Sequence, residues 1–139
     1  MALIPKKFKY KKYLKGKLYG NKLRNNLITG DISLKANELG RLTPKQIETT
    51  KRLIRKIIKP KGGIVKTKIT AHIPVTAKPL AVRMGRGKGK ISIYTAPVKK
   101  GTILFEIFCL DKTTAYNALK KAGYKLPIQT KIILNFKLS

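Results

Sequence analysis

The segment from Lys78 to Lys90 holds the side chains of this chain that are best suited to binding a charged partner. It contains no carboxylate, and its cations and spaced glycines are Lys78, Arg83, Arg86, Lys88 and Lys90, with Gly85, Gly87 and Gly89. Glycine lets a backbone adopt positive φ and approach another surface closely. Cations with no acid nearby are available to a polyanion, and nucleic acid is the obvious one. The alternative is a solvated surface loop that binds nothing.

Nucleotide-binding motifs do not account for these glycines. A P-loop needs glycine five residues before its Gly-Lys pair and Ser or Thr after it. Around Gly89-Lys90 those two positions hold Met84 and Ile91. The dinucleotide fingerprint counted from Gly85 requires glycine where Lys90 stands. Both nucleotide motifs are therefore absent from the loop.

The residue types also give little support to catalysis. The five acidic residues are scattered along the chain and offer no close pair for acid–base work. The single Cys109 excludes an internal disulfide and a multi-cysteine zinc site. Cys109 and His72 could meet in the fold as nucleophile and base, but a buried thiol and a structural histidine are the expected states. We therefore expect no enzymatic activity, no metal, no cofactor and no small-molecule substrate.

The composition favours a polyanionic partner. Lys and Arg number 33 against 5 Asp and Glu, which gives a formal charge of +28. Self-repulsion at that density opposes compaction, so a partner normally matches such a charge. The 42% hydrophobic content, in periodic runs, distinguishes the chain from a disordered basic tail, and 139 residues suit one domain. No apolar stretch approaches the roughly 20 residues that span a bilayer, and no targeting segment is recognisable.

Residues 1–24 are expected to form a basic, extended N-terminal arm, followed by a single domain over residues 25–139. The arm has no acid, and its cations are predicted to contact phosphates: Lys6, Lys7, Lys9, Lys11, Lys12, Lys15, Lys17, Lys22 and Arg24. The interleaved aromatic residues are Phe8, Tyr10, Tyr13 and Tyr19. Their rings either stack on bases or pack back on the domain, and the sequence leaves both open.

A helix is strongly indicated after Gly40-Arg41-Leu42. Thr43 is a candidate cap, Pro44 suits the first position and Gln46 completes a capping box. Apolar residues from Ile47 to Ile58 recur at three- and four-residue steps and predict a core-facing stripe. The helix ends at Lys59-Pro60-Lys61-Gly62-Gly63. Glu48 can pair with Arg52, whereas the cations around the helix are predicted to bind nucleic acid: Arg41, Lys45, Lys51, Arg52, Arg55, Lys56 and Lys59.

The remaining elements complete an α+β pattern. Strands are expected over 27–39, 64–71, 91–98, 102–108 and 129–136, and the central loop over 74–90. The strands at 91–98 and 102–108 are interpreted as an antiparallel hairpin turning at Lys99-Lys100-Gly101. Asp111 is a candidate cap for a second helix, with Ala115, Ala118, Leu119 and Ala122 inward and Gly123 at its C-terminus. The expected domain is one with two helices packed on mixed or antiparallel strands.

Four stretches, taken in order, resemble the bacterial and organellar family of large-ribosomal-subunit protein sixteen. Residues 5–12 are similar to that family's basic arm, and residues 40–48 to its first-helix signature. Residues 78–89, Lys-Pro-Leu-Ala-Val-Arg-Met-Gly-Arg-Gly-Lys-Gly, are close to its central loop. Residues 125–128 resemble its C-terminal end. Residues 17–38 match poorly, and a Trp often found after the loop is replaced by the Ile93-Tyr94 neighbourhood.

The resemblance implies an α+β protein bound to large-subunit rRNA and to neighbouring ribosomal proteins. It implies that the loop lies near tRNA and the peptidyl-transferase centre, with Arg83, Met84, Arg86 and Lys88 closest. The implied role is architectural: the protein helps to organise the aminoacyl-tRNA site and supports late subunit assembly. Heavy use of Lys and Ile and the lack of a presequence favour an organelle-encoded mitochondrial protein, with a plastid or bacterial ribosome left open.

Two other function classes remain as alternatives. A free-standing RNA chaperone or general nucleic-acid binder is compatible with the charge, but not with the four ordered stretches. A cationic membrane-active protein needs a helix with a broad apolar face. The helix after Thr43 comes nearest, but its apolar stripe is expected to serve a core.

Overall fold

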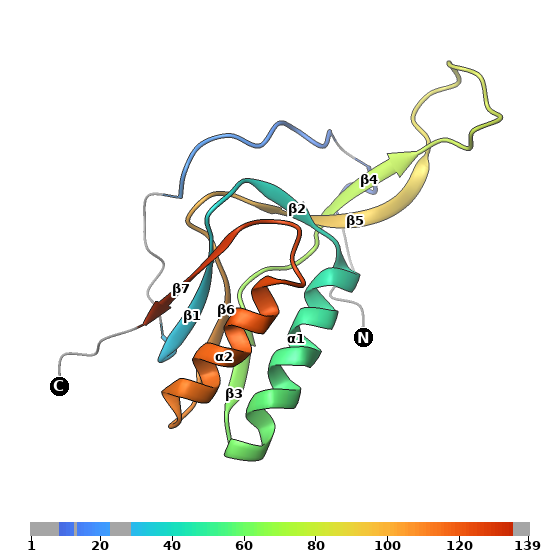
Figure 1. Ribbon diagram of the computed structural model, residues 1–139. Helices are drawn as coiled ribbons and strands as arrows, with labels where there is room; N and C mark the ends of the chain where they lie inside the picture. The colour runs from blue at the N-terminus through green and yellow to red at the C-terminus, as the bar shows by residue number, and fades with distance from the viewer. Residues whose placement is uncertain (1–8, 13, 23–28, 135–139) are drawn as a thin grey trace.

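The computed structural model describes residues 9–12, 14–22 and 29–134, which form an α+β fold with two antiparallel sheets and two helices (Figure 1). One sheet has the strand order β3-β6-β1-β7, with bounds Ile64–Thr67, Ile103–Phe108, Ile32–Ala36 and Thr130–Leu134. The other has the order β2-β5-β4, with bounds Gly40–Leu42, Lys90–Val98 and Ile73–Ala77. The helices are α1, Pro44–Ile58, and α2, Lys112–Gly123. The predicted fold class is confirmed.

Helix α1 begins where its local sequence predicts. The Thr43 backbone N–H donates to Gln46 Oε1 at 2.9 Å, and Gln46 N–H donates to Thr43 Oγ1 at 3.3 Å. This capping box satisfies donors that a helix start leaves without partners. Ile47, Ile54 and Ile58 are fully buried, so the apolar stripe faces the core as expected. A 3₁₀ turn, Lys59–Lys61, ends the helix.

The core lies between the two helices and one face of the four-stranded sheet (Figure 1). Leu34 of β1 is opposite Phe105 of β6, and both are buried among helix residues. Asp111 caps α2 by accepting hydrogen bonds from the backbone of Thr113 and Thr114. The predicted inner face of α2 is confirmed, because its buried residues are Ala115, Ala118, Leu119 and Ala122.

The central loop is shorter than the expected span of 74–90. Residues Ile73–Ala77 form β4 and Lys90 already belongs to β5, so the loop runs from Lys78 to Gly89. Pro74 fits in β4 because this is an edge strand, where one side of the backbone makes no ladder hydrogen bonds. The strand expected over 64–71 likewise ends at Thr67 as β3. Strand β1 covers only the middle of the region expected at 27–39, and β7 covers only the middle of the region expected at 129–136. Residues 27–28 and 135–136 lie outside the described part of the chain.

The predicted hairpin between residues 91–98 and 102–108 is wrong. Strand β5 pairs with β2 and β4, whereas β6 pairs with β1 and β3 in the other sheet. The turn at Lys99–Gly101 carries the chain from one sheet to the other. Gly101 has φ 91° and its N–H donates to Ala36 O at 2.8 Å. The hairpin that the structure does contain is β4–β5.

Gly123 serves packing rather than a left-handed cap. It is the last residue of α2, and the cap that follows it, Tyr124, has right-handed φ and ψ. A Cβ at Gly123 would lie 2.8 Å from Thr130 Oγ1, so a larger residue would require the Thr130 side chain or β7 to shift. The predicted helix end is therefore confirmed in position but not in conformation.

Candidate nucleic-acid interface

The β4–β5 hairpin carries the central loop away from the rest of the protein, where the loop occupies the far tip (Figure 1). Ala77 and Lys90 are paired at its base. Every residue from Lys78 to Lys88 is exposed. The predicted loop cations therefore lie together in solvent: Lys78, Arg83, Arg86, Lys88 and Lys90.

The glycines of the loop have two different structural roles. Gly85, Arg86 and Gly87 are consecutive residues with positive φ, at 105°, 52° and 77°. No atom lies within 4 Å of a Cβ built at Gly85 or Gly87, so the backbone conformation is what requires glycine there. At Gly89 the reason is space, because a Cβ would lie 2.8 Å from the Ala77 carbonyl carbon. The tip thus bends through a left-handed stretch of backbone at residues 85–87, and the loop packs closely on β4 at Gly89.

One loop cation is used inside the loop itself. The Lys78 ammonium donates a hydrogen bond to Gly85 O and ties the start of the loop to its tip. Arg83 and Arg86 make no such bond with any described residue. They are the loop cations best placed to meet a partner.

The described part of the N-terminal arm is extended and mostly exposed, and it contacts the β4–β5 side of the protein. Lys12 Nζ donates to Lys88 O at 3.2 Å, which joins the arm to the loop. Further along, Lys22 N–H donates to Lys100 O at 2.8 Å beside the turn between the sheets. The arm and the loop therefore meet at Lys12 and Lys88, and both carry exposed cations. Lys6, Lys7 and Arg24 lie outside the described residues.

Arg41 holds the arm in place. Its Nη2 donates to Lys15 O at 3.0 Å and to Gly16 O at 2.7 Å, while Nη1 is buried without a partner among the described residues. The sequence predicts Arg41 as an RNA contact and does not reveal this role, because a long-range bond to two backbone carbonyls has no local sequence signal. An RNA contact by Arg41 stays a prediction.

The rings of the arm that the structure describes do not pack into the core. Tyr10 and Tyr19 keep 64% and 74% of their surface exposed. The Lys99 ammonium lies 5.9 Å from the centre of the Tyr19 ring, at the outer limit of a cation–π contact. The exposure favours stacking on a partner, which was one of the two interpretations open from sequence. Phe8 and Tyr13 lie outside the described residues.

Helix α1 contributes a second group of cations. Lys45, Arg52, Arg55, Lys56 and Lys59 are exposed, and Lys51 is half-buried. Arg52 pairs with Glu48 at 2.7 Å, as predicted, and this hydrogen bond holds the pKa of the Glu48 carboxyl below its usual value. The other cations of α1 have no carboxylate partner in the described structure.

All five carboxylates of the chain are engaged within the protein. Asp31 Oδ2 accepts from Cys109 N–H at 3.1 Å, and Glu38 Oε2 accepts from Gln129 N–H at 3.2 Å. Glu106 is buried, and its Oε2 lies 3.2 Å from Lys68 Nζ.

Asp111 is the most heavily bonded of these carboxylates. It accepts from the Lys61 ammonium and from both threonines of the first turn of α2, so the pKa of Asp111 lies well below its usual range, chiefly because of Lys61. The acids pair with Arg52, Lys61 and Lys68, and they are too few to neutralise most of the exposed cations.

The described residues contain no group of three or more His, Cys, Asp or Glu side chains that could hold a metal ion. His72 is exposed with Nδ1 3.1 Å from Thr70 O, and Cys109 is buried. A buried thiol and an exposed imidazole do not form a nucleophile–base pair. None of the described helices is long and apolar enough to cross a membrane.

Comparisons with known proteins agree along nearly the whole chain. The family model for ribosomal protein L16p/L10e matches residues 5–133. Large ribosomal subunit protein uL16 of Blochmanniella pennsylvanica is 42% identical over 133 residues, which cover 96% of this chain and 98% of that protein. Large ribosomal subunit protein uL16c of Porphyra purpurea is 43% identical over 133 residues, 95% of each chain. The uL16 protein of a Sulfurihydrogenibium species is 43% identical over 135 residues, covering 96% of this chain and 97% of its own.

Proposed function

Because this chain belongs to the ribosomal protein L16p/L10e family, we propose that it is a structural constituent of the large ribosomal subunit that binds large-subunit rRNA. The family is structural and not enzymatic. Beyond membership, one observation carries the proposal. The basic arm contacts the basic loop through Lys12 and Lys88, while every acidic side chain is bonded inside the protein.

Such a surface suits the RNA backbone more than it suits base sequence. Contacts from Lys and Arg to phosphate fix position and supply affinity, whereas sequence is read at base edges. A-form RNA is recognised mainly through its shape, its phosphates and its 2′-hydroxyls. We expect the arm, the cations of α1 and the loop to contact rRNA together.

The loop is the proposed contact with the functional centre of the subunit. Its exposed Arg83, Met84, Arg86 and Lys88 would lie nearest tRNA and the peptidyl-transferase centre. The exposure of these side chains at the tip of the β4–β5 hairpin supports this role, because it leaves them accessible to a partner. In this proposal the protein positions RNA and tRNA, helps to organise the aminoacyl-tRNA site and supports late assembly.

A mitochondrial ribosome is the location that we propose, with the gene in the organelle. The support is compositional: the chain uses Lys and Ile heavily, as AT-rich genomes do. Fractionation that recovers the protein in bacterial cytoplasm or in plastids instead of mitochondria would overturn this part of the proposal alone.

Sedimentation through a sucrose gradient tests the central claim. An integral component of the subunit co-migrates quantitatively with the large subunit at moderate salt and remains with it at high salt. A protein that runs free, or that is stripped off as salt rises, is a free-standing RNA chaperone or general nucleic-acid binder instead.

The loop is tested separately with Arg83→Ala combined with Arg86→Ala. Both side chains are exposed and make no bond to a described residue, so the domain should keep its fold. Translation should fall on ribosomes that contain the variant. Normal translation on fully occupied ribosomes would contradict the role of the loop without affecting the ribosomal assignment.

A further inference from the structure

Helix α2 presents a stripe of alternating cations and aromatic rings to solvent. Lys112, Tyr116, Lys120 and Tyr124 follow one another at four-residue steps, so they lie along one side of the helix and its cap. All four are exposed, with 45% of the Tyr116 surface and 78% of the Tyr124 surface free. We call these four residues the α2 stripe. The core-facing residues of the helix are Ala115, Ala118, Leu119 and Ala122, so core packing does not explain the two rings.

The charged side chains of helix α2 are all positive. Helix α2 contains no carboxylate, and Asp111 before it is occupied by Lys61 and by the threonines that it caps. None of the four stripe side chains forms a hydrogen bond, an ion pair or a ring contact with another described residue. A helix that presents exposed cations and aromatic rings, and no carboxylate, is suited to binding a polyanion that also has flat, apolar groups.

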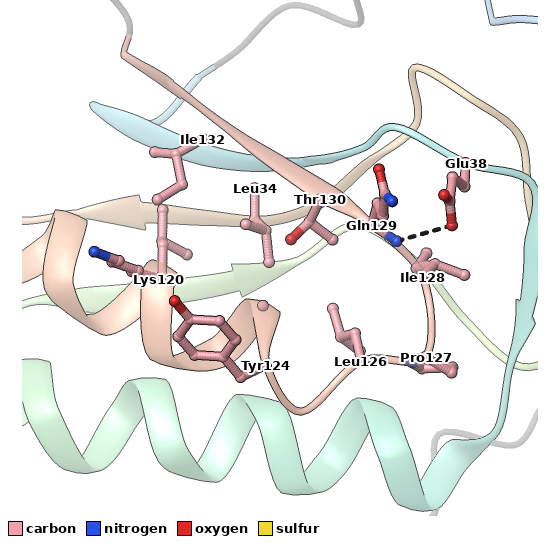
Figure 2. Close-up of a pocket in the computed structure, with 12 residues that line it drawn as sticks. Leu34, Glu38, Lys120, Tyr124, Leu126, Pro127, Ile128, Gln129, Thr130 and Ile132 are labelled. Carbon is pink, nitrogen blue, oxygen red and sulfur yellow. Dashed lines mark hydrogen bonds between the residues drawn. The ribbon is translucent and has the colours of Figure 1, made fainter.

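The stripe ends at a groove between α2, β1 and β7 (Figure 2). Lys120 and Tyr124 border it on the helix side, and Thr130 and Ile132 border it on the β7 side. Leu126 and Ile128 supply apolar lining.

The groove contains one carboxylate, but that group is not free. The lining carboxylate is Glu38, whose Oε2 accepts from Gln129 N–H, as the dashed line in Figure 2 shows. An apolar lining with a ring at one side and hydroxyl and amide groups nearby offers the kinds of contact that a nucleobase makes.

We propose that the α2 stripe and this groove bind an unpaired segment of RNA. The tyrosine rings stack on exposed bases, and Lys112 and Lys120 contact the adjoining phosphates. Unpaired bases offer their faces to aromatic side chains, whereas a duplex keeps its bases stacked on one another. The proposal rests on the rRNA-binding function above but adds a second surface, which lies at the opposite end of the protein from the loop (Figure 1).

The test uses the full-length protein with two probes, a short single-stranded RNA of mixed sequence and the blunt duplex of the same length. Tyr116→Leu with Tyr124→Leu removes both rings but keeps apolar bulk. Stacking contributes about 1–3 kcal/mol per base, so single-strand binding should weaken about 5- to 150-fold per ring, with duplex binding unchanged. The matched control, Tyr116→Phe with Tyr124→Phe, keeps the rings and should bind like the wild type.

Salt dependence separates the two parts of the stripe. Each phosphate contact to single-stranded RNA contributes about 0.7 to the slope of log affinity against log salt. Lys112→Gln with Lys120→Gln should therefore reduce that slope by about 1.4, whereas the leucine variant should leave it unchanged. Leu110→Ala, at a fully exposed apolar residue outside the stripe, should alter neither property.

Several results would overturn the proposal. Equal single-strand binding by the leucine and phenylalanine variants, with native circular dichroism in both, would show that the rings do not stack. An equal loss on the duplex would show that the site does not select unpaired bases. A polyglutamate peptide whose binding falls in the leucine variant, while RNA binding does not, would identify an acidic protein as the partner. A wild-type protein that binds neither RNA would instead contradict the rRNA-binding function itself.

Discussion

The buried pair of Glu106 and Lys68 leads to an asymmetric prediction about stability. The Glu106 side chain has no exposed surface, and its Oε2 accepts from Thr29 Oγ1 at 2.7 Å and lies 3.2 Å from Lys68 Nζ. Its Oε1 is buried without a partner among the described residues. The Lys68 side chain keeps 35% of its surface exposed. Loss of the Lys68 ammonium therefore leaves the buried Glu106 carboxylate without a counter-ion. Loss of the carboxylate charge leaves only an ammonium that reaches water.

The expected magnitudes follow from this difference in burial. Removing one partner of a fully buried pair costs about 3–5 kcal/mol. Since Lys68 is partly exposed, we expect Lys68→Met to lower the free energy of unfolding by about 3 kcal/mol. Glu106→Gln keeps an acceptor for Thr29 and should cost about 1 kcal/mol. With a shift of roughly 3 °C per kcal/mol for a domain of this size, the melting temperatures should fall by about 9 °C and about 3 °C.

Urea unfolding and thermal melting of the full chain at neutral pH measure both values. The double variant, Lys68→Met with Glu106→Gln, should lie close to Glu106→Gln alone, because it leaves no unpaired buried charge. If Lys68→Met costs no more than Glu106→Gln, the buried carboxylate does not depend on Lys68 and the reasoning is refuted.

Three further predictions concern the helix caps and the loop. Thr43→Ala removes the capping hydroxyl of α1 and should cost about 1 kcal/mol in urea unfolding, and an unchanged midpoint would contradict the cap's role. Asp111 has a lowered pKa when folded, so its contribution to stability is full above the ordinary pKa near ~3.9 and declines as pH falls below it. Urea midpoints measured through the acid range should show this decline in the wild type and a weaker one in Asp111→Asn. In RNA titrations, Arg83→Gln should lower the slope of log affinity against log salt concentration by about 0.7–0.9. Lys78→Gln should lower this slope less, because the Lys78 ammonium is already bonded within the loop. Equal changes in the two variants would contradict that distinction.

Local signals in the sequence were sufficient to predict the helices. Thr43, Pro44 and Gln46 define the start of α1 through contacts within one turn, and the spacing of its isoleucines identifies the buried face. Asp111 does the same for α2. The loop cations were also predictable, because glycine and charge mark the segment without reference to the rest of the fold.

The pairing of the strands and the long-range hydrogen bonds could not be predicted in this way. Alternation identifies a strand and its faces but not its neighbour, so β5 and β6 were interpreted as a hairpin although they belong to different sheets. Pro74 concealed β4, since proline is excluded from central strands but tolerated at an edge. The bonds from Arg41 to Lys15 O and Gly16 O join groups about two dozen residues apart and follow no sequence pattern. The α2 stripe, by contrast, has a readable four-residue spacing.

The central position of β1 has a consequence for how the protein folds during its own synthesis. Strand β1 lies near the start of the chain and is flanked by β6 and β7, which are the last strands to be made. The ladder with β6 can close only after Phe108 has been made and the ladder with β7 only after Leu134, and closing such long loops is slow. The β4–β5 hairpin needs only the residues from Ile73 to Val98 and can form much earlier. The loop-bearing hairpin can thus form before β6, α2 and β7 are made, and a nascent chain truncated before Thr130 would leave β1 as an unpaired edge strand that another chain could pair with.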